Sequence, residues 1–319
     1  MNSRVRKGAV LIITLWILAI LAILSIGIGG RMALELKLTA LHRDGVQALY
    51  SAKAGVKRSI DILLKQDHAI DSLNEAWSNN DEDVNPAFRN IKIGEAGSFT
   101  VSYIYAGERV FYGFQDEKSR LNINGVPPEA IGRLIWYLDR GSDNADEIAQ
   151  NIADWCDQNV TGQDGTPEYD YVNEGYTRKD AKFDVFDELM LVKGVDQALL
   201  SRIKDYVTVY PVSNSAKVNV NTAGPAVLYA LGFAESEAAD IVSYRAGEDG
   251  IEGTGDDVVL NDVSFADFLS VLPEDRRSLV GYGSDCYRII STGYSANNNV
   301  SRTVTAVVCG ENILFWGEE

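Results

Sequence analysis

The hydrophobic pattern of the chain is dominated by an uncharged apolar run near its start. Residues 9 to 30 carry no charged side chain, and Arg4, Arg6 and Lys7 precede them. About 20 helical residues cross the hydrocarbon core of a bilayer. The run therefore predicts a single transmembrane helix. The positive-inside rule predicts that the short basic leader lies in the cytoplasm and that the rest of the chain lies outside.

The helical pattern continues beyond this run. Apolar or small residues recur every three or four positions to about Leu64, which predicts one continuous helix with a narrow apolar stripe. A plain membrane anchor does not need this continuation, whereas a subunit that packs its helix against similar helices does. The plain anchor remains an alternative. The stripe consists of Leu34, Leu38, Leu41, Gly45, Leu49, Ala52, Val56, Ile60 and Leu63.

Two strand-rich segments flank a long middle of helical pattern. Residues 98–105 and 109–114 are rich in β-branched and aromatic side chains and are predicted to form a hairpin. Residues 286–294 and 301–309 are predicted to form a second hairpin around an Asn-rich turn. We therefore expect an α+β fold, in which a long N-terminal helix lies on a small antiparallel sheet and a large, mostly helical insertion interrupts that sheet.

The predicted insertion contains an internal duplication. Residues 121–135 align with residues 218–232 at a constant offset of 97, which matches two Asn-x-Asn pairs and a following proline. Each copy predicts an Asn-rich turn and then a proline in the first turn of a helix. Chance similarity among amphipathic helices is the alternative. Further matches in the same order pair Ile152, Trp155, Phe183, Phe186 and Leu189 with Ile241, Tyr244, Phe265, Phe268 and Val271.

Composition narrows the classes of function. The net charge of −17 argues against a protein built to hold nucleic acid, because such proteins cluster Lys and Arg. Only two histidines are present, so the sequence offers few residues for a histidine-based zinc site or a Ser-His-Asp triad. A turn at residues 191–203 is similar to a DNA-binding helical hairpin, but Asp196 would repel a phosphate there and is predicted to be a helix N-cap. We expect neither an enzyme nor a nucleic-acid partner.

Two acidic, glycine-containing loops lie at corresponding places in the two copies, at residues 156–171 and 246–262. Calcium takes six to eight oxygen ligands in flexible geometry, which closely spaced carboxylates in such loops can supply. Calcium is therefore the expected cofactor, and a solvated acidic loop is the alternative. The candidate ligands are Asp249, Glu252, Asp256 and Asp257 in the second loop, and Asp157, Asp164 and Glu168 in the first.

The three cysteines suggest at most one disulfide. Cys286 and Cys309 fall opposite each other if the last hairpin is symmetric about Asn297 and Asn298, so an oxidising compartment would allow a bridge. A register slip of one residue would separate them. Cys156 follows Trp155 on a helical pattern and is expected to be a buried apolar residue.

The N-terminal features together resemble those of type IV pilins and type II secretion pseudopilins. These features are the basic leader ending in Gly8, the apolar helix, and residues 48–64 on the same helix. In that family a prepilin peptidase on the cytoplasmic side cuts after the glycine, which implies that Ala9 becomes the first, usually N-methylated, residue. Most members have Glu at the fifth mature position, where this chain has Ile13. This departure makes the chain most similar to the general secretion pathway protein K family of minor pseudopilins.

The resemblance implies a single-pass inner-membrane protein with a periplasmic body. It implies a place at the tip of the pseudopilus, where the chain assembles with other minor pseudopilins of the I and J types and both initiates and caps the filament of major pseudopilin. The stripe and Ile13 would face these partners, and Ile13 would need no acidic group because no subunit lies above it. Calcium is associated with the family. A pilus subunit acting in adhesion or DNA handling, and an anchored periplasmic enzyme, are the alternatives.

The expected organisation follows from these observations. It comprises a cleaved leader (1–8), a transmembrane helix (9–30), its amphipathic continuation (31–66), the first part of a pilin-like body (67–115), the helical insertion (116–283) with units at about 116–205 and 214–280, and a C-terminal hairpin that completes the body (284–319).

Overall fold

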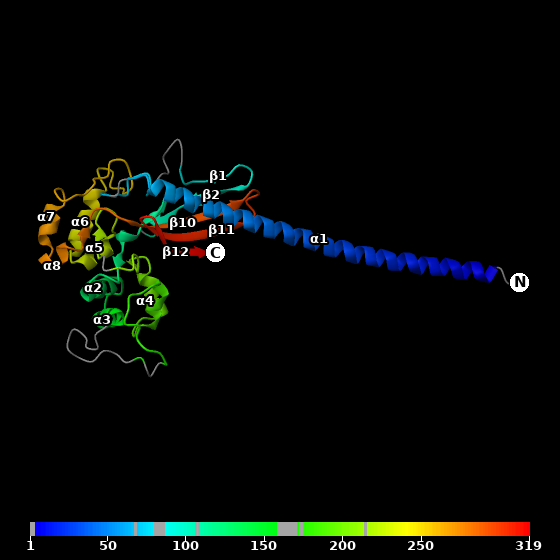
Figure 1. The fold of residues 1–319 in the computed structure, drawn as a ribbon, viewed down its shortest axis with the longest axis horizontal. Helices are drawn as coiled ribbons and strands as arrows, with labels where there is room; N and C mark the ends of the chain where they lie inside the picture. The colour runs from blue at the N-terminus through cyan, green and yellow to red at the C-terminus, as the bar shows by residue number, and fades with distance from the viewer. Residues whose placement is uncertain are drawn as a thin grey trace.

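A long helix projects from a body built of a sheet and many short helices (Figure 1). The computed structural model describes residues 4–66, 69–79, 87–105, 107, 109–157, 171, 175–213 and 216–319. Helix α1 spans Arg4–Leu63 and is continuous over 60 residues, as the apolar run and the stripe predict. From Asp44 onward its side chains begin to be buried against the body, whereas the preceding turns stand free.

The body is an antiparallel sheet on which the C-terminal third of α1 lies. Its strand order is β1-β2-β10-β11-β12, and β5 also pairs with β10. This arrangement confirms the expected α+β fold. The strands are β1 (Ile91–Lys92), β2 (Gly97–Val101), β5 (Gln115–Asp116), β10 (Cys286–Ser295), β11 (Ser301–Cys309) and β12 (Asn312–Glu318).

Close approach of α1 to the sheet depends on two glycines. Gly55 on the helix has no room for a Cβ beside Ser291, and Gly293 on β10 has none beside the helix backbone. Ala52 and Val56 are consequently buried against the sheet in the same core as Val304. Small residues at the contact therefore fix the helix on the sheet.

The strand predictions are partly wrong. The predicted first hairpin is shorter than expected: β3 (Tyr103–Tyr105) pairs with β4 (Arg109–Phe111), whereas residues 98–101 belong to β2 and pair with β10 in the main sheet. The C-terminal hairpin of β10 and β11 is present, but a third strand, β12, follows it and forms one edge of the sheet.

The insertion between β5 and β10 contains the same order of elements twice. The first copy consists of β6 (Leu121–Asn122), α2 (Pro128–Leu138), α3 (Ala145–Cys156), the 3-10 helix η3 (Phe186–Leu191), α4 (Gln197–Ile203) and β7 (Val207–Thr208). The second consists of β8 (Val218–Asn219), α5 (Pro225–Leu231), α6 (Glu235–Arg245), α7 (Ala266–Val271), α8 (Glu274–Arg277) and β9 (Val280–Gly281). In each copy the first and last strands pair in parallel, which supports the duplication. A short 3-10 helix, η1 (Glu117–Ser119), precedes the first copy.

A buried asparagine closes each copy in the same way. Asn124 donates to the carbonyls of Phe183 and Val209, both at 2.9 Å, and its Oδ1 accepts from the Phe183 amide at 2.8 Å. Asn221 donates to the carbonyls of Leu260 and Tyr282 at 3.0 and 3.3 Å and accepts from the Leu260 amide at 2.7 Å. These bonds make Leu260 the counterpart of Phe183. The predicted match of Phe183 with Phe265 is therefore wrong by five residues, because similar apolar side chains recur along both segments.

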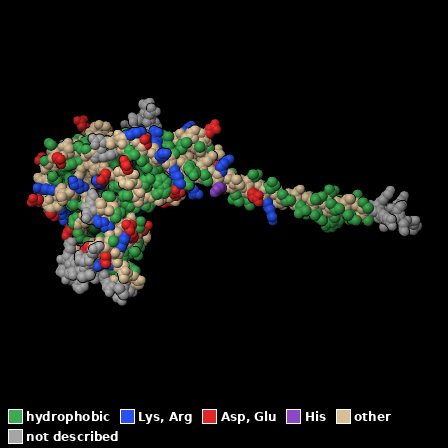
Figure 2. Space-filling view, viewed as in Figure 1, with side chains coloured by type: hydrophobic (Ala, Val, Ile, Leu, Met, Phe, Trp, Pro, Cys, Tyr) green, Lys and Arg blue, Asp and Glu red, His purple; other side chains and the backbone are tan. Residues whose placement is uncertain are grey.

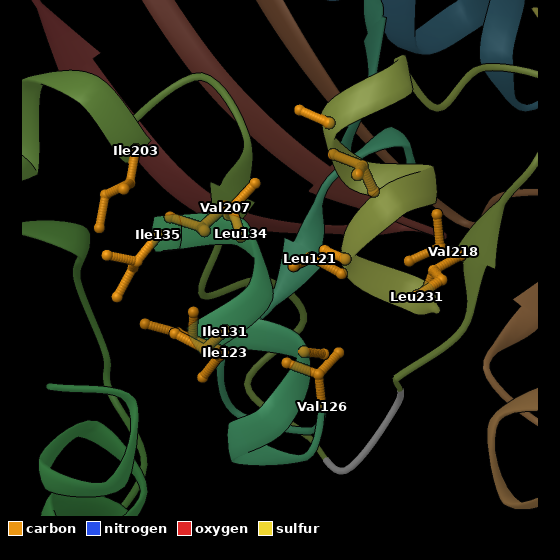
Figure 3. Packing of buried hydrophobic residues seen from close by; sticks show 14 of the residues in the cluster. Leu121, Ile123, Val126, Ile131, Leu134, Ile135, Ile203, Val207, Val218 and Leu231 are labelled. Atoms are coloured by element: carbon orange, nitrogen blue, oxygen red, sulfur yellow. The ribbon is translucent and has the colours of Figure 1, made fainter. Parts of the chain in front are cut away.

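The two copies share one hydrophobic core. In Figure 3, Leu121 of the first copy lies between Leu134 of the same copy and the side chains of Val218 and Leu231 of the second, and all four belong to one core. All four side chains are fully buried. Val307 of β11 belongs to the same core and Phe315 of β12 packs against it, so the insertion rests on the face of the sheet opposite α1.

Candidate assembly surface and acidic loops

The projecting part of α1 is an apolar surface that no other described residue covers. In the described part of the chain, this is the one helix long and apolar enough to cross a membrane. Figure 2 shows hydrophobic side chains over most of it, with charged side chains gathered on the body. Gly8 and Ala9 both lie within α1, and Ile13 is 58 % exposed on the same helix.

The apolar stripe divides into two halves with different neighbours. Leu34, Leu38 and Leu41 are 58, 56 and 48 % exposed. Ala52, Val56 and Leu63 are buried inside the body, while Leu49 and Ile60 are half-buried against the same core. The prediction that the whole stripe faces other subunits is therefore wrong for its C-terminal half, which this chain covers with its own sheet. Periodicity identifies an apolar face but not what covers it.

Three carboxylates of the second acidic loop converge on one hydroxyl group. Thr254 Oγ1 lies 3.1 Å from Asp249 Oδ2, 2.7 Å from Asp256 Oδ1 and 3.4 Å from Asp257 Oδ1. It also lies 3.1 Å from the carbonyl oxygen of Ile251. A hydroxyl has one hydrogen to donate, so at most one of these oxygens receives a full hydrogen bond. Sequence reasoning does not single out Thr254, because a lone threonine in a glycine-rich loop belongs to no pattern.

The second oxygen of each carboxylate is held by backbone amides. Asp256 Oδ2 accepts from the amides of Glu248 and Asp249 at 2.8 and 3.1 Å, and Asp257 Oδ2 accepts from the Gly253 amide at 2.7 Å. The Thr254 hydroxyl and these amides lower the pKa of Asp256, whereas burial raises the pKa of Asp257. The loop therefore orients one oxygen of each carboxylate inward, as a calcium site requires.

These groups do not yet form a coordination shell. Among the residues that the structure describes, no three His, Cys, Asp or Glu side chains are placed to hold a metal ion. The inward oxygens nevertheless fit calcium in chemical type, since carboxylates and a carbonyl are the ligands it prefers. In the first loop, Asp157 follows the end of α3, and the candidates Asp164 and Glu168 lie outside the described residues.

Glu252 serves a different purpose from the one predicted. Its carboxylate pairs with buried Arg245 and accepts from the Tyr105 hydroxyl at 2.6 Å, while its carbonyl accepts from Arg109 at 2.8 Å. Tyr105 and Arg109 belong to the β3–β4 hairpin, so Glu252 fastens the loop to the body. A side chain already paired with an arginine is poorly suited to ligate a cation.

A buried carboxylate joins the insertion to the sheet. Asp116 at the end of β5 accepts from Thr222 Oγ1 at 2.6 Å, Asn219 Nδ2 at 2.9 Å and the Lys118 amide at 2.7 Å. Burial raises the pKa of Asp116 to about 6, and these donors limit the rise. Glu117 beside it pairs with Arg288 of β10, which keeps the pKa of Glu117 below its usual value despite its burial.

The cysteines lie where the hairpin register places them. Cys286 and Cys309 are cross-strand partners and form a disulfide, with their Cα atoms 4.0 Å apart. Cys156 is half-buried, and its burial raises the pKa of its thiol to about 11. A thiol with a raised pKa is a poor nucleophile at neutral pH. Asp196 caps α4 by accepting from the Leu199 amide at 2.7 Å, as predicted.

Comparison with known proteins points to one family. The family model described as "Type II secretion system (T2SS), protein K" matches residues 117–212. A curated protein named type II secretion system protein K from Pseudomonas aeruginosa is 26% identical over 275 residues, which cover 79% of this chain and 76% of the relative. The protein of the same name from Aeromonas hydrophila is 27% identical over 231 residues, covering 70% of this chain and 69% of the relative.

A solved structure has the same fold. It is described as the crystal structure of the GspK-GspI-GspJ complex from the type 2 secretion system of enterotoxigenic Escherichia coli. One chain of that structure matches with a TM-score of 0.66 at 16% identity, over 88% of this chain and 99% of that chain. The match extends the similarity from the insertion to most of the described architecture.

Proposed function

Because this chain is a member of the type II secretion protein K family, and so a minor pseudopilin, we propose that it assembles with I- and J-type minor pseudopilins at the tip of the pseudopilus. The exposed apolar surface of α1 carries this proposal. Most side chains of residues 9–43 are apolar and exposed, whereas the body covers one face of the rest of the helix. The solved chain that this one resembles comes from a structure described as the GspK-GspI-GspJ complex, which supports assembly with two other proteins of the secretion system.

The part of the helix that lies beyond the membrane gains free energy when a helical partner covers it. Burying a fully exposed leucine contributes about 1.5–3 kcal/mol, so the half-exposed Leu34, Leu38 and Leu41 together offer about 3 kcal/mol to a helical partner. The uncharged run before them first spans the inner membrane, with the basic leader in the cytoplasm and the body in the periplasm. Prepilin peptidase then removes the leader after Gly8. Ile13 fits an apolar environment in which no neighbouring terminal amine has to be neutralised.

The shape of the body supports a capping role. The helices of the insertion lie at the end of the molecule that is opposite to the N-terminus of α1 (Figure 1). A subunit added above this chain would have to pass that bulk, whereas subunits below it meet only the projecting helix. The chain would therefore begin a filament of major pseudopilin and would catalyse no reaction.

The assembly surface is tested by placing a charge on it. In the full chain, Leu38→Asp is expected to abolish co-purification with the I- and J-type partners and secretion of exported proteins. Leu64→Asp is the matched control, because Leu64 is 55 % exposed and Leu38 is 56 % exposed. Equal co-purification of the two variants would overturn the proposal.

Processing is tested separately at the glycine of the leader. Gly8→Ala is expected to leave the basic leader on the mature protein and to block secretion, because the peptidase would lose its cleavage site. Gly27→Ala, at a glycine in the apolar run with open space around its Cβ position, should be processed as the unaltered chain is. Removal of the leader from the Gly8→Ala variant would place the cleavage site elsewhere.

We also propose that the second acidic loop binds calcium, through Asp249, Asp256 and Asp257. The inward carboxylate oxygens around Thr254 support this, and an affinity of about 10⁻⁴ to 10⁻³ M is expected for an extracellular loop. Calcium titration should slow amide exchange in residues 246–257. Asp256→Asn should weaken binding at least tenfold, whereas Asp267→Asn on α7 should not. Equal affinity of the two variants would refute the site.

A DNA-handling role lacks comparable support. Asp196 accepts from the Leu199 amide in the first turn of α4, and α6 begins with Glu235 and has Glu237 in the same turn. Each carboxylate lies where a phosphate would have to bind and would repel it.

A further inference from the structure

We propose that the free edge of β12 is a second assembly surface, on which the body of another minor pseudopilin adds an extended strand. This inference rests on the proposed function, because it takes the partner from the same tip complex. It concerns a different element from the projecting helix, and the two can fail separately.

The hydrogen-bond register shows which groups of β12 face outward. Thr303 and Glu319 exchange two backbone hydrogen bonds, at 3.1 and 2.9 Å. Such pairs alternate with non-bonded pairs along an antiparallel ladder. Residues Trp316 and Glu318 therefore direct their N–H and C=O groups away from β11. In the described part of the chain no strand pairs with that side of β12.

The side chains of β12 are unusually apolar for an open edge. Ile313, Leu314 and Trp316 are 50, 41 and 39 % exposed. Natural edge strands are commonly protected by lysine, proline or inward charges, and residues 312–318 contain neither lysine nor proline. The charge of Glu318 is paired with Lys53, at 2.8 Å. Only a bulge at Leu314 disturbs the edge, so this strand is suited to being covered.

The position of β12 selects the kind of partner. The Lys53–Glu318 ion pair holds the strand beside α1, and Lys53 also lies over the ring of Tyr50. Tyr50 and Val46 are 66 and 41 % exposed on that flank of the helix. The exposed surface thus runs from the projecting helix to the strand edge. A subunit whose helix packs on α1 would carry its own sheet to β12, and backbone pairing requires only an extended strand from it. A second copy of this chain is disfavoured by the repulsion between two charges of −17.

The experiment adds charge to the edge of the full-length chain. Leu314→Lys with Trp316→Lys is expected to reduce co-purification of a partner minor pseudopilin at least tenfold. Ile104→Lys with Val110→Lys is the matched control, because these residues are 66 and 52 % exposed on the β3–β4 hairpin. The control should retain the partner. Formation of the Cys286–Cys309 disulfide, assayed by thiol labelling, reports whether each variant folds.

A second measurement needs no variant. Amide exchange of Trp316 and Glu318 in the unaltered chain should slow when the partner is bound, since their N–H groups would enter a new ladder. Unchanged exchange in the complex would overturn the inference, as would full co-purification by the lysine variant. Protection that appears without partners and disappears on dilution would also overturn it, because the occupant would then be a second copy. If Leu38→Asp abolishes assembly but the lysine variant does not, only the β12 inference fails; if Leu38→Asp has no effect, the proposed function itself fails.

Discussion

Replacing Gly293 with alanine tests how α1 is held on the sheet. A Cβ at this position of β10 would lie 2.9 Å from the Cα of Ala52 and closer still to the Ala48 carbonyl oxygen and the Ala52 amide nitrogen. An α-helix joins residues four apart by that oxygen and that nitrogen. The obstacle is therefore helix backbone, which cannot rotate away as a side chain can.

The expected cost follows from this geometry. Carbon atoms in contact prefer a separation of about 3.5–4.0 Å, so α1 would have to move away from β10 by about 1 Å. Overpacking a core costs about 1–3 kcal/mol, and the movement would also loosen the contacts of buried Ala52 and Val56. We expect Gly293→Ala to lower the free energy of unfolding by about 3 kcal/mol.

Denaturation of the full chain in detergent micelles, followed by circular dichroism, measures this loss. Amide exchange should show the change at α1 from residue 45 onward and at β10. Gly45→Ala is the control, since nothing lies within 4 Å of its Cβ position and alanine favours a helix over glycine by up to about 1 kcal/mol. The reasoning is refuted if the free energy of unfolding of Gly293→Ala is within about 0.5 kcal/mol of that of the unaltered chain.

Three further changes test the core of the body and insertion. Asn221→Ala removes three hydrogen bonds to backbone groups and should lower the free energy of unfolding, measured by thermal unfolding, by about 3–5 kcal/mol. A loss as small as that caused by Asn299→Ala, at an exposed asparagine, would show that these hydrogen bonds do not stabilise the second copy. Cys286→Ser removes a disulfide between residues 23 apart and should lower the free energy of unfolding, measured by denaturant titration, by about 3 kcal/mol. The variant should then be as stable as the unaltered chain after reduction. Burial raises the pKa of Asp116 from 3.8 to about 6, so the folded state favours the neutral acid. Its contribution is complete below pH 3.8 and is lost as the pH rises through 6, by about 3 kcal/mol. Asp116→Asn should remove that part of the pH dependence, and an unchanged pH profile of unfolding would show that another group causes it.

The parts of the fold that could be predicted are those governed by local pattern. Helix α1 follows from its uncharged run and stripe, and the register of Cys286 with Cys309 follows from a symmetric hairpin. The break at Ser102 could not be predicted in this way. Its amide donates to Ile290 of β10 at 3.1 Å, and the chain then leaves the main sheet for β3. Pairing with strands that are distant in sequence decides where such a strand ends, and this pairing does not change the alternation of apolar and polar residues.

Strand β12 could not be predicted from the sequence pattern either. Its sequence, residues 312–318, follows a turn at Gly310, which has a φ of +56°. It does not alternate between apolar and polar residues because neither of its faces is fully covered. A strand with two half-exposed faces has no period of two to recognise. The candidate calcium residues could be predicted, because carboxylates in a glycine-rich loop are recognisable in a sequence. The pairing of Glu252 with Arg245 could not be predicted, because it depends on the folded position of the loop.

The hydrogen bonds of Asn124 and Asn221 explain why the acidic loops can differ in length while the two copies keep the same fold. Asn124 reaches 59 residues ahead to Phe183, whereas Asn221 reaches only 39 ahead to Leu260. In each case two hydrogen bonds with the asparagine side chain fix the far end of the intervening segment, so the length of that segment does not alter the core of the unit. The second loop is then free to bind elsewhere, and Glu252 docks it on the β3–β4 hairpin of the body. An ion that ordered this loop would therefore act on the junction between insertion and body.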